Sequence, residues 1–135
     1  MQTLSLNTDI IVACERAQRF PDDVLRAHQK IHKLIAFDGN RRFFGISFGT
    51  GNGTINYMAA AECFPEDQCF ENVEKYQIKK GEYLVVEIRN FRENISAIGE
   101  AFQTMISRPD IDQEGACIEW YPNLSDVHCM VRLAR

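Results

Sequence analysis

Apolar residues recur three or four positions apart in two segments of the chain, the spacing that places side chains on one face of an α-helix. The first segment predicts a helix over residues 22–36 that stops at Asp38, and it opens with a proline and two acidic residues. The second predicts a helix over residues 95–108, with Asn94 as a candidate N-terminal cap. The two apolar stripes consist of Val24, His28, Ile31 and Ile35, and of Ile95, Ile98, Phe102, Met105 and Ile106.

Seven further segments are short, largely apolar and separated by turn-forming residues, a pattern typical of strands. The first begins at Ile10, and no element is predicted before it. The glycine-rich segment 49–53 predicts a hairpin turn, because it lacks the ending of a phosphate-binding loop and joins two strands. A polar connection over residues 65–72 lies near the middle of the chain. The predicted strands cover residues 10–17, 42–48, 54–64, 73–79, 82–88, 116–121 and 127–134.

The order of these elements is strand–helix–strand–strand, and it occurs twice. This order predicts an α+β domain over residues 1–135, in which two helices pack on an antiparallel sheet. The half-repeats are about 1–68 and 69–135, and they rest on element order alone because the halves share negligible sequence identity. A pseudo-twofold arrangement would leave a central cleft between them, where ligand pockets often form.

Length and composition narrow the classes of protein. The chain has 135 residues and a formal net charge of −4, which fits one globular domain and argues against a dedicated nucleic-acid binder. The N-terminus carries no basic and apolar leader, and no apolar run approaches the roughly 20 residues that span a bilayer. We therefore expect a cytoplasmic protein that does not contact membranes and whose five cysteines are reduced thiols.

Glu119 is the most informative residue, because it lies in a strand of apolar and aromatic residues. Alternation places Cys117, Glu119 and Tyr121 on one face and Ile118 and Trp120 on the other. If the face of Glu119 is buried, its carboxylate needs a proton or a partner such as a ligand cation. If that face is turned outward, Glu119 is an ordinary solvated residue, and alternation alone leaves both readings open.

Other chemistry has weaker support. His28 and His32 are four positions apart on one predicted helix, but His28 lies on its apolar face and suits a core or a pocket wall. Cys63 and Cys69 lack the spacing of a structural zinc site, so we expect no metal and no cofactor. No nucleophile motif occurs, and the strand cysteines are most simply small core residues.

Several stretches resemble the GyrI-like small-molecule-binding family, the effector-binding domain of AraC- and MerR-type regulators and of stand-alone relatives. In the second half these are residues 76–86, 95–102 and the Ile-Glu-Trp-Tyr segment 118–121, which resembles the family's Glu-x-Tyr strand. In the first half, residues 44–47 and 57–62 resemble the family's hairpin. The resemblance implies a tandem β-α-β-β fold with its pocket between the halves. Because it takes up the whole chain, it implies a stand-alone member without a helix-turn-helix domain.

The resemblance also implies roles for individual residues. Glu119 corresponds to the glutamate that contacts cationic, lipophilic ligands, and Tyr121 to the tyrosine of the same motif. Tyr57 corresponds to a tyrosine of the hairpin and Phe102 to an aromatic residue of the helix. The expected ligand-binding residues are Glu119, Tyr121, Trp120, Tyr57, Phe44 and Phe102, although alternation points Trp120 away from Glu119.

Three functions follow as hypotheses. The leading one is a stand-alone binding protein for amphipathic, cationic or aromatic small molecules, held by Glu119 in an aromatic cleft. The second is a hydrolase of electrophilic, cyclopropane-containing toxins, with Glu119 as the catalytic residue, because some stand-alone relatives resemble such hydrolases. The third is a protein-interaction module, because the family includes a gyrase-inhibiting protein.

Overall fold

The computed structural model describes residues 1–35, 39–66 and 72–135, and it is an α+β fold, as the sequence predicts. Eight strands form one antiparallel sheet in the order β1-β6-β8-β7-β3-β4-β2-β5. The helices are α1 (Val24–Leu34) and α2 (Ser96–Ile106), with the 3₁₀ turn η2 (Phe91–Glu93) before α2. The strands are β1 (Gln2–Leu6), β2 (Ile10–Arg16), β3 (Phe43–Gly49), β4 (Ile55–Glu62), β5 (Glu74–Ile78), β6 (Gly81–Ile88), β7 (Cys117–Tyr121) and β8 (Val127–Arg132).

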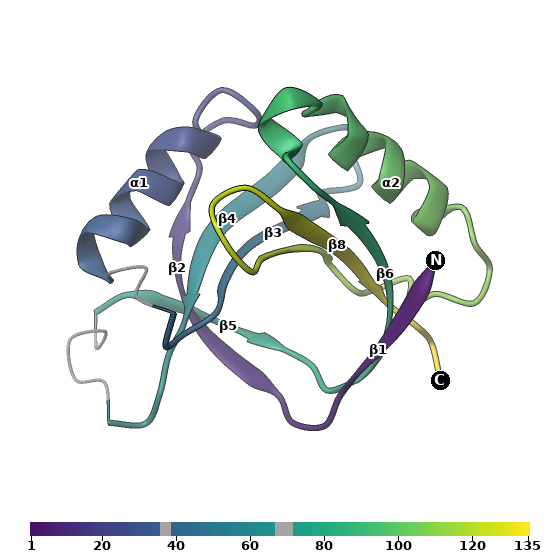
Figure 1. Ribbon diagram of the computed structural model, residues 1–135, viewed down its shortest axis with the longest axis horizontal. Helices are drawn as coiled ribbons and strands as arrows, with labels where there is room; N and C mark the ends of the chain where they lie inside the picture. Colours follow the sequence, from purple (N-terminus) through teal and green to yellow (C-terminus); the bar gives the residue numbers. More distant parts are fainter. Residues whose placement is uncertain (36–38, 67–71) are drawn as a thin grey trace.

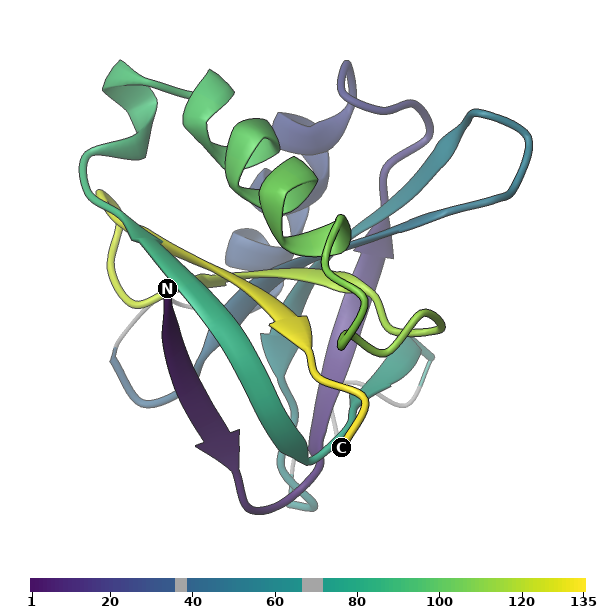
Figure 2. The same ribbon diagram turned by 90° about the vertical axis from the view of Figure 1, so that its right-hand side faces the viewer.

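The sheet curls into a half-barrel, and both helices lie on its outer face (Figure 1). Helix α1 packs on β4 and β2, whereas α2 packs on β8 and β6. The central pair β3 and β7 therefore lies between the strands that carry the two helices. The β3–β4 hairpin extends beyond the rest of the sheet (Figure 2).

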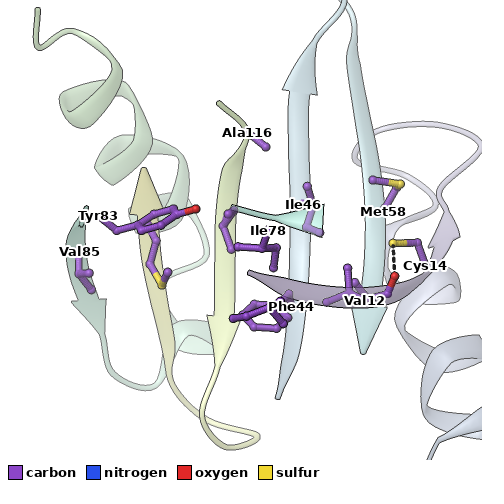
Figure 3. Packing of buried hydrophobic residues seen from close by; sticks show 13 residues of the cluster. Val12, Cys14, Phe44, Ile46, Met58, Ile78, Tyr83, Val85 and Ala116 are labelled. Atoms are coloured by element: carbon purple, nitrogen blue, oxygen red, sulfur yellow. Dashed lines mark hydrogen bonds between the residues drawn. The ribbon is translucent and has the colours of Figure 1, made fainter. Parts of the chain in front are cut away.

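Alternating side chains divide the sheet into an inner and an outer face. The inner face holds one apolar core inside the curl, where Val12 and Ile78 gather with Phe44 and Ile46 (Figure 3). The outer face holds two smaller cores, one under each helix. Phe43 belongs to the core under α1, while its neighbour Phe44 belongs to the inner core. Consecutive residues of a strand thus serve different faces, and this decides which side chains can meet Glu119.

The structure confirms the predicted strands and both helices, with two differences. Strand β1 was not predicted, and it pairs with β6 at one edge of the sheet. Helix α2 begins at Ser96, and the Asn94 side chain accepts a hydrogen bond from the Ser96 hydroxyl instead of capping the helix. The predicted helix end at 36, its stop at Asp38, the middle of the 65–72 connection and Cys69 lie outside the described residues.

Candidate functional site

Glu119 lies in the middle of β7, on the outer face of the sheet. It is 9% exposed and is the one buried charged residue in the described part of the chain. Its strand neighbours Ile118 and Trp120 pack with the inner core, while Cys117 and Tyr121 pack with the core under α2. The alternation predicted from the sequence is therefore confirmed, and of the two readings it left open the buried one is correct.

Two tyrosine hydroxyls hold one oxygen of the Glu119 carboxylate. The hydroxyl of Tyr57, from β4, donates to Oε1 at 2.7 Å, and that of Tyr121 donates to the same oxygen at 2.6 Å. His28, from α1, lies 2.6 Å from the Tyr57 hydroxyl through its Nε2. The Tyr57 hydroxyl already uses its hydrogen in the bond to Glu119, so its oxygen acts as the acceptor toward His28. His28 Nε2 therefore carries a hydrogen and donates it to the Tyr57 oxygen. We call these four residues the carboxylate cluster.

Gly45 makes room for this cluster. Gly45 is on β3, where it lies opposite Glu119 of β7 on one side and opposite Ala59 of β4 on the other. A Cβ atom at position 45 would overlap the Tyr57 hydroxyl and Glu119 Oε1, and it would lie 2.8 Å from Tyr57 Cζ. The Tyr57–Glu119 hydrogen bond thus occupies the space in which any other residue would place its side chain.

The second carboxylate oxygen, Oε2, differs from the first. It accepts no hydrogen bond from the described residues, and no salt bridge joins Glu119 to a cation among them. The described part of the chain contains no fully buried polar side-chain atom without a partner. Oε2 therefore keeps a small solvent-exposed area and no hydrogen-bond partner among the described residues.

Burial changes the protonation of the cluster. Desolvation raises the pKa of Glu119, and the hydrogen bonds from Tyr121 and Tyr57 oppose it. Desolvation, reinforced by the nearby Glu119 charge, raises the pKa of Tyr57 and of Tyr121, so both hydroxyls keep their protons as donors. Burial, with a smaller effect of His32, lowers the pKa of His28 to about 4. At neutral pH the site thus combines a neutral imidazole and two neutral phenols with a Glu119 carboxyl group whose pKa is raised and which has no cationic partner among the described residues.

Aromatic rings surround the two tyrosines. Phe20, which precedes α1, stacks on Tyr57 with ring centroids 5.7 Å apart. Phe91, in η2 before α2, lies 5.5 Å from Tyr121, and the His28 ring meets Tyr121 edge-on at 5.4 Å. Phe20 is 43% exposed, so part of its ring is available to a ligand. We call Phe20 and Phe91 the aromatic rim.

The expected ligand-binding residues fall into two groups. Glu119, Tyr121 and Tyr57 come together, and Phe102 is buried on the same face in the core under α2, with Tyr121 packed against that core. Trp120 and Phe44 lie on the inner face of the sheet. They cannot form a common wall with Glu119, because each is next in sequence to a residue of the cluster's face and so points the opposite way.

Sequence reasoning missed Gly45 and the aromatic rim. Gly45 carried a usable signal, because a glycine inside an otherwise apolar strand often marks a close approach of another group. Phe20 and Phe91 carried none, since both lie outside the predicted helices and strands. His28 was expected in a core or a pocket wall, and it contacts Tyr57 and Tyr121.

Comparisons with known proteins show the fold but not the family. No family model matches the chain, and no curated protein matches it. An integron cassette protein from the mobile metagenome of Vibrio cholerae has a similar structure, with a TM-score of 0.71 and 11% sequence identity. The match covers 98% of this chain and 94% of that one, so the same fold extends over both.

The described residues include no group of three or more histidine, cysteine or acidic side chains arranged to hold a metal ion. None of the helices they form has the length and apolar character needed to cross a membrane.

Proposed function

We propose that this protein binds amphipathic small molecules, cationic or aromatic, at the carboxylate cluster, in the manner of the GyrI-like family. The observation that carries the proposal is the buried Glu119 carboxylate, which has one oxygen held by two tyrosines and the other unbonded. A buried carboxylate without a cation is unfavourable, so a ligand that supplies positive charge gains more here than in water.

The arrangement of the strands supports a tandem β-α-β-β repeat. From one edge of the sheet toward its centre, three successive strands are β6, β8 and β7. From the other edge toward the centre, the corresponding strands are β2, β4 and β3. In each set the strand after the helix lies at the centre and the strand before the helix lies outermost. The cluster spans the junction of these halves, because His28 and Tyr57 come from the first and Glu119 and Tyr121 from the second. We infer that the ligand binds at this junction, where ligand pockets often form.

The chemistry of the rim favours a lipophilic cation over a small hydrated one. Rings such as Phe20 and Tyr121 attract a cation by roughly 0.5–2 kcal/mol each. A cation whose charge is spread over a large apolar body loses little hydration on entering the site. A metal ion or an alkylammonium group would lose more, and the tyrosine donors already occupy Oε1.

Binding of tetraphenylphosphonium and of its uncharged analogue triphenylphosphine oxide tests the role of the charge. At a separation of 4 Å and an effective dielectric constant near 20, an ion pair is worth about 4 kcal/mol before desolvation is subtracted. We expect Glu119→Gln to weaken the binding of tetraphenylphosphonium by about 10- to 100-fold in calorimetry, which corresponds to about 1.4–2.8 kcal/mol of binding free energy. The affinity for the oxide should change by less than about threefold, because the uncharged oxide forms no ion pair with Glu119.

Glu100→Gln is the matched control, since it removes the same charge from an exposed position of α2. It should leave both affinities unchanged. Equal losses for the cation and the oxide in Glu119→Gln would refute the charge role.

A second candidate is a hydrolase of cyclopropane-containing electrophiles, favoured by the raised pKa of Glu119 and by its second oxygen, which accepts no hydrogen bond from the described residues. The water oxygen would form a bond to a ring carbon while a C–C bond of the cyclopropane breaks, and the electron pair of that bond would move into the conjugated carbonyl. Glu119 would accept the proton that water loses and return it to the resulting enolate, so that one water is added overall. Mass spectrometry of such a substrate after incubation would show an added water, absent with Glu119→Gln. Saturable binding without product would leave only the binding function. The third hypothesis, a protein-interaction module, has no specific observation in its favour.

A further inference from the structure

The inner face of the half-barrel contains a cavity that the carboxylate cluster does not use. Its volume is about 210 Å³. Its lining comes from β1, the first residue of β2, β3 with the residue before it, β7 and β8, so it lies on the concave side of the sheet, whereas Glu119 lies on the convex side. The lining residues are Leu4, Ser5, Leu6, Ile10, Arg42, Phe44, Trp120 and Met130.

Most of this lining is apolar core. Ile10, Phe44 and Met130 are buried members of the inner core, and Leu4 and Leu6 pack against it. The cavity is open to solvent on one side, since Ser5 is exposed and Leu4, Leu6, Arg42 and Trp120 are only partly buried. A void of about 150 Å³ lined by aliphatic and aromatic side chains is known to bind benzene, so the space here suits a body of one or two small rings.

Two residues of the lining keep a hydrogen-bond donor for which the described residues supply no acceptor. Arg42 bonds Glu62 through Nε at 3.1 Å and Nη2 at 2.7 Å, which leaves its Nη1 without an acceptor among the described residues. The Trp120 indole N–H likewise donates to no acceptor in the described ranges, although its ring meets His128 edge-on at 5.1 Å.

We propose that this cavity is a second small-molecule site, which takes an uncharged, compact, apolar molecule that carries a hydrogen-bond acceptor, such as a cyclic ketone or lactone. The apolar lining binds the body of the molecule, and Arg42 and Trp120 donate to its oxygen. A carboxylate is disfavoured because Glu62 already neutralises Arg42 and would repel a second anion. A cation is disfavoured because Arg42 is the charged group of the lining. The two sites therefore select opposite ligand chemistry.

The single tryptophan of the chain provides a direct readout, because it lines this cavity and not the carboxylate cluster. The ¹H–¹⁵N spectrum contains one indole cross-peak, that of Trp120. We expect the bicyclic ketone 2-norbornanone to shift this peak saturably. The parent hydrocarbon norbornane should bind at least threefold more weakly, because it offers no acceptor to the two donors.

Two variants test the location. Leu6→Phe fills the cavity and should weaken 2-norbornanone at least tenfold, while the same change at the exposed Leu25 on α1 should leave binding unchanged. Ile10→Phe is a second filling variant, used if thermal unfolding shows that Leu6→Phe does not fold. Glu119→Gln should leave 2-norbornanone binding unchanged, so failure of this site and failure of the proposed cation site are separate results.

The proposal is overturned by any of three results. The first is no saturable shift of the Trp120 peak at millimolar 2-norbornanone. The second is an unchanged affinity in a folded filling variant. The third is loss of binding in Glu119→Gln, which would place the ketone at the carboxylate cluster.

Discussion

Gly45→Ala is the smallest change that should disrupt the carboxylate cluster without touching any of its members. The new methyl group would overlap the Tyr57 hydroxyl and Glu119 Oε1 and would lie 2.8 Å from Tyr57 Cζ. Either Tyr57 or Glu119 must therefore move, and the hydrogen bond between them breaks. A hydrogen bond to a charged group contributes about 1.5–3 kcal/mol, and crowding of a packed site costs about 1–3 kcal/mol, although the two effects overlap.

Replacing glycine by alanine also stabilises a protein by about 0.4–1 kcal/mol through the unfolded chain. The net loss in the free energy of unfolding should then be about 1–3 kcal/mol, or a decrease in Tm of roughly 3–10 °C at this chain length. Denaturant unfolding and calorimetry measure both quantities. The same variant should weaken tetraphenylphosphonium, because a displaced carboxylate no longer faces the ligand.

Gly99→Ala is the matched control, because Gly99 lies within α2 and a Cβ atom there meets no other atom within 4 Å. Alanine in the interior of an exposed helix should stabilise the protein by about 0.5–1 kcal/mol. In a Tyr57→Phe background the loss caused by Gly45→Ala should shrink, since the closest obstructing atom is gone. A Gly45→Ala protein as stable as the wild type, with ligand affinity unchanged, would refute this account of the cluster.

Three further predictions follow from protonation and from the two faces of the sheet. The pKa of His28 falls from 6.5 to about 4 on folding, so its contribution to stability is present above pH 6.5 and is lost as the pH falls toward 4. In urea unfolding at pH 7 and pH 4.5, His28→Gln should therefore lose less stability on acidification than the wild type. The pKa of Glu119 is raised above 4.5, so its contribution is present below that pH and is lost as the pH rises through the folded value. Glu119→Gln should gain stability relative to the wild type between pH 4 and pH 7, and a constant difference would contradict the raised pKa. Tyr121→Phe should weaken tetraphenylphosphonium at least threefold in calorimetry and Trp120→Phe should not, whereas the reverse result would place the cation on the inner face.

Periodicity predicted the elements of the fold because most of them bury one continuous face. Helix α1 shows this directly, since Ile31 and Ile35 of its predicted apolar stripe lie in the core that it covers. Strand β1 was missed for a physical reason. Its alternation of Leu4 and Leu6 with Thr3 and Ser5 covers only five residues, and its partner β6 lies about 80 residues away in the sequence. This short edge strand is stabilised by its pairing with β6, and a local sequence pattern cannot predict such a distant contact.

The site was predictable only as far as local geometry extends. Alternation placed Glu119 and Tyr121 on one face, and the structure confirms that placement. The resemblance added Tyr57, which does reach Glu119, and Phe44, which does not. Phe44 and Trp120 cannot line one wall with Glu119, because neighbouring residues of a strand point to opposite faces of the sheet. Phe20 reaches Tyr57 from the loop before α1, so its role depends on how the helix packs on the sheet.

Three unfavourable choices meet at one point of the sheet, and their coincidence argues that the point has a function. Glu119 is a charge in a buried place, where an apolar residue of similar size would be neutral or stabilising. Gly45 forgoes a packed side chain in a central strand, where glycine is weakening. Tyr57 places a hydroxyl in the space that results. A fold that needed only stability would replace all three by apolar side chains, whereas a site that needs an anion with one accessible oxygen requires each of them. Because Glu119, Gly45 and Tyr57 lie on three adjacent strands, β7, β3 and β4, no single strand's packing explains them, and the shared contact with the carboxylate does.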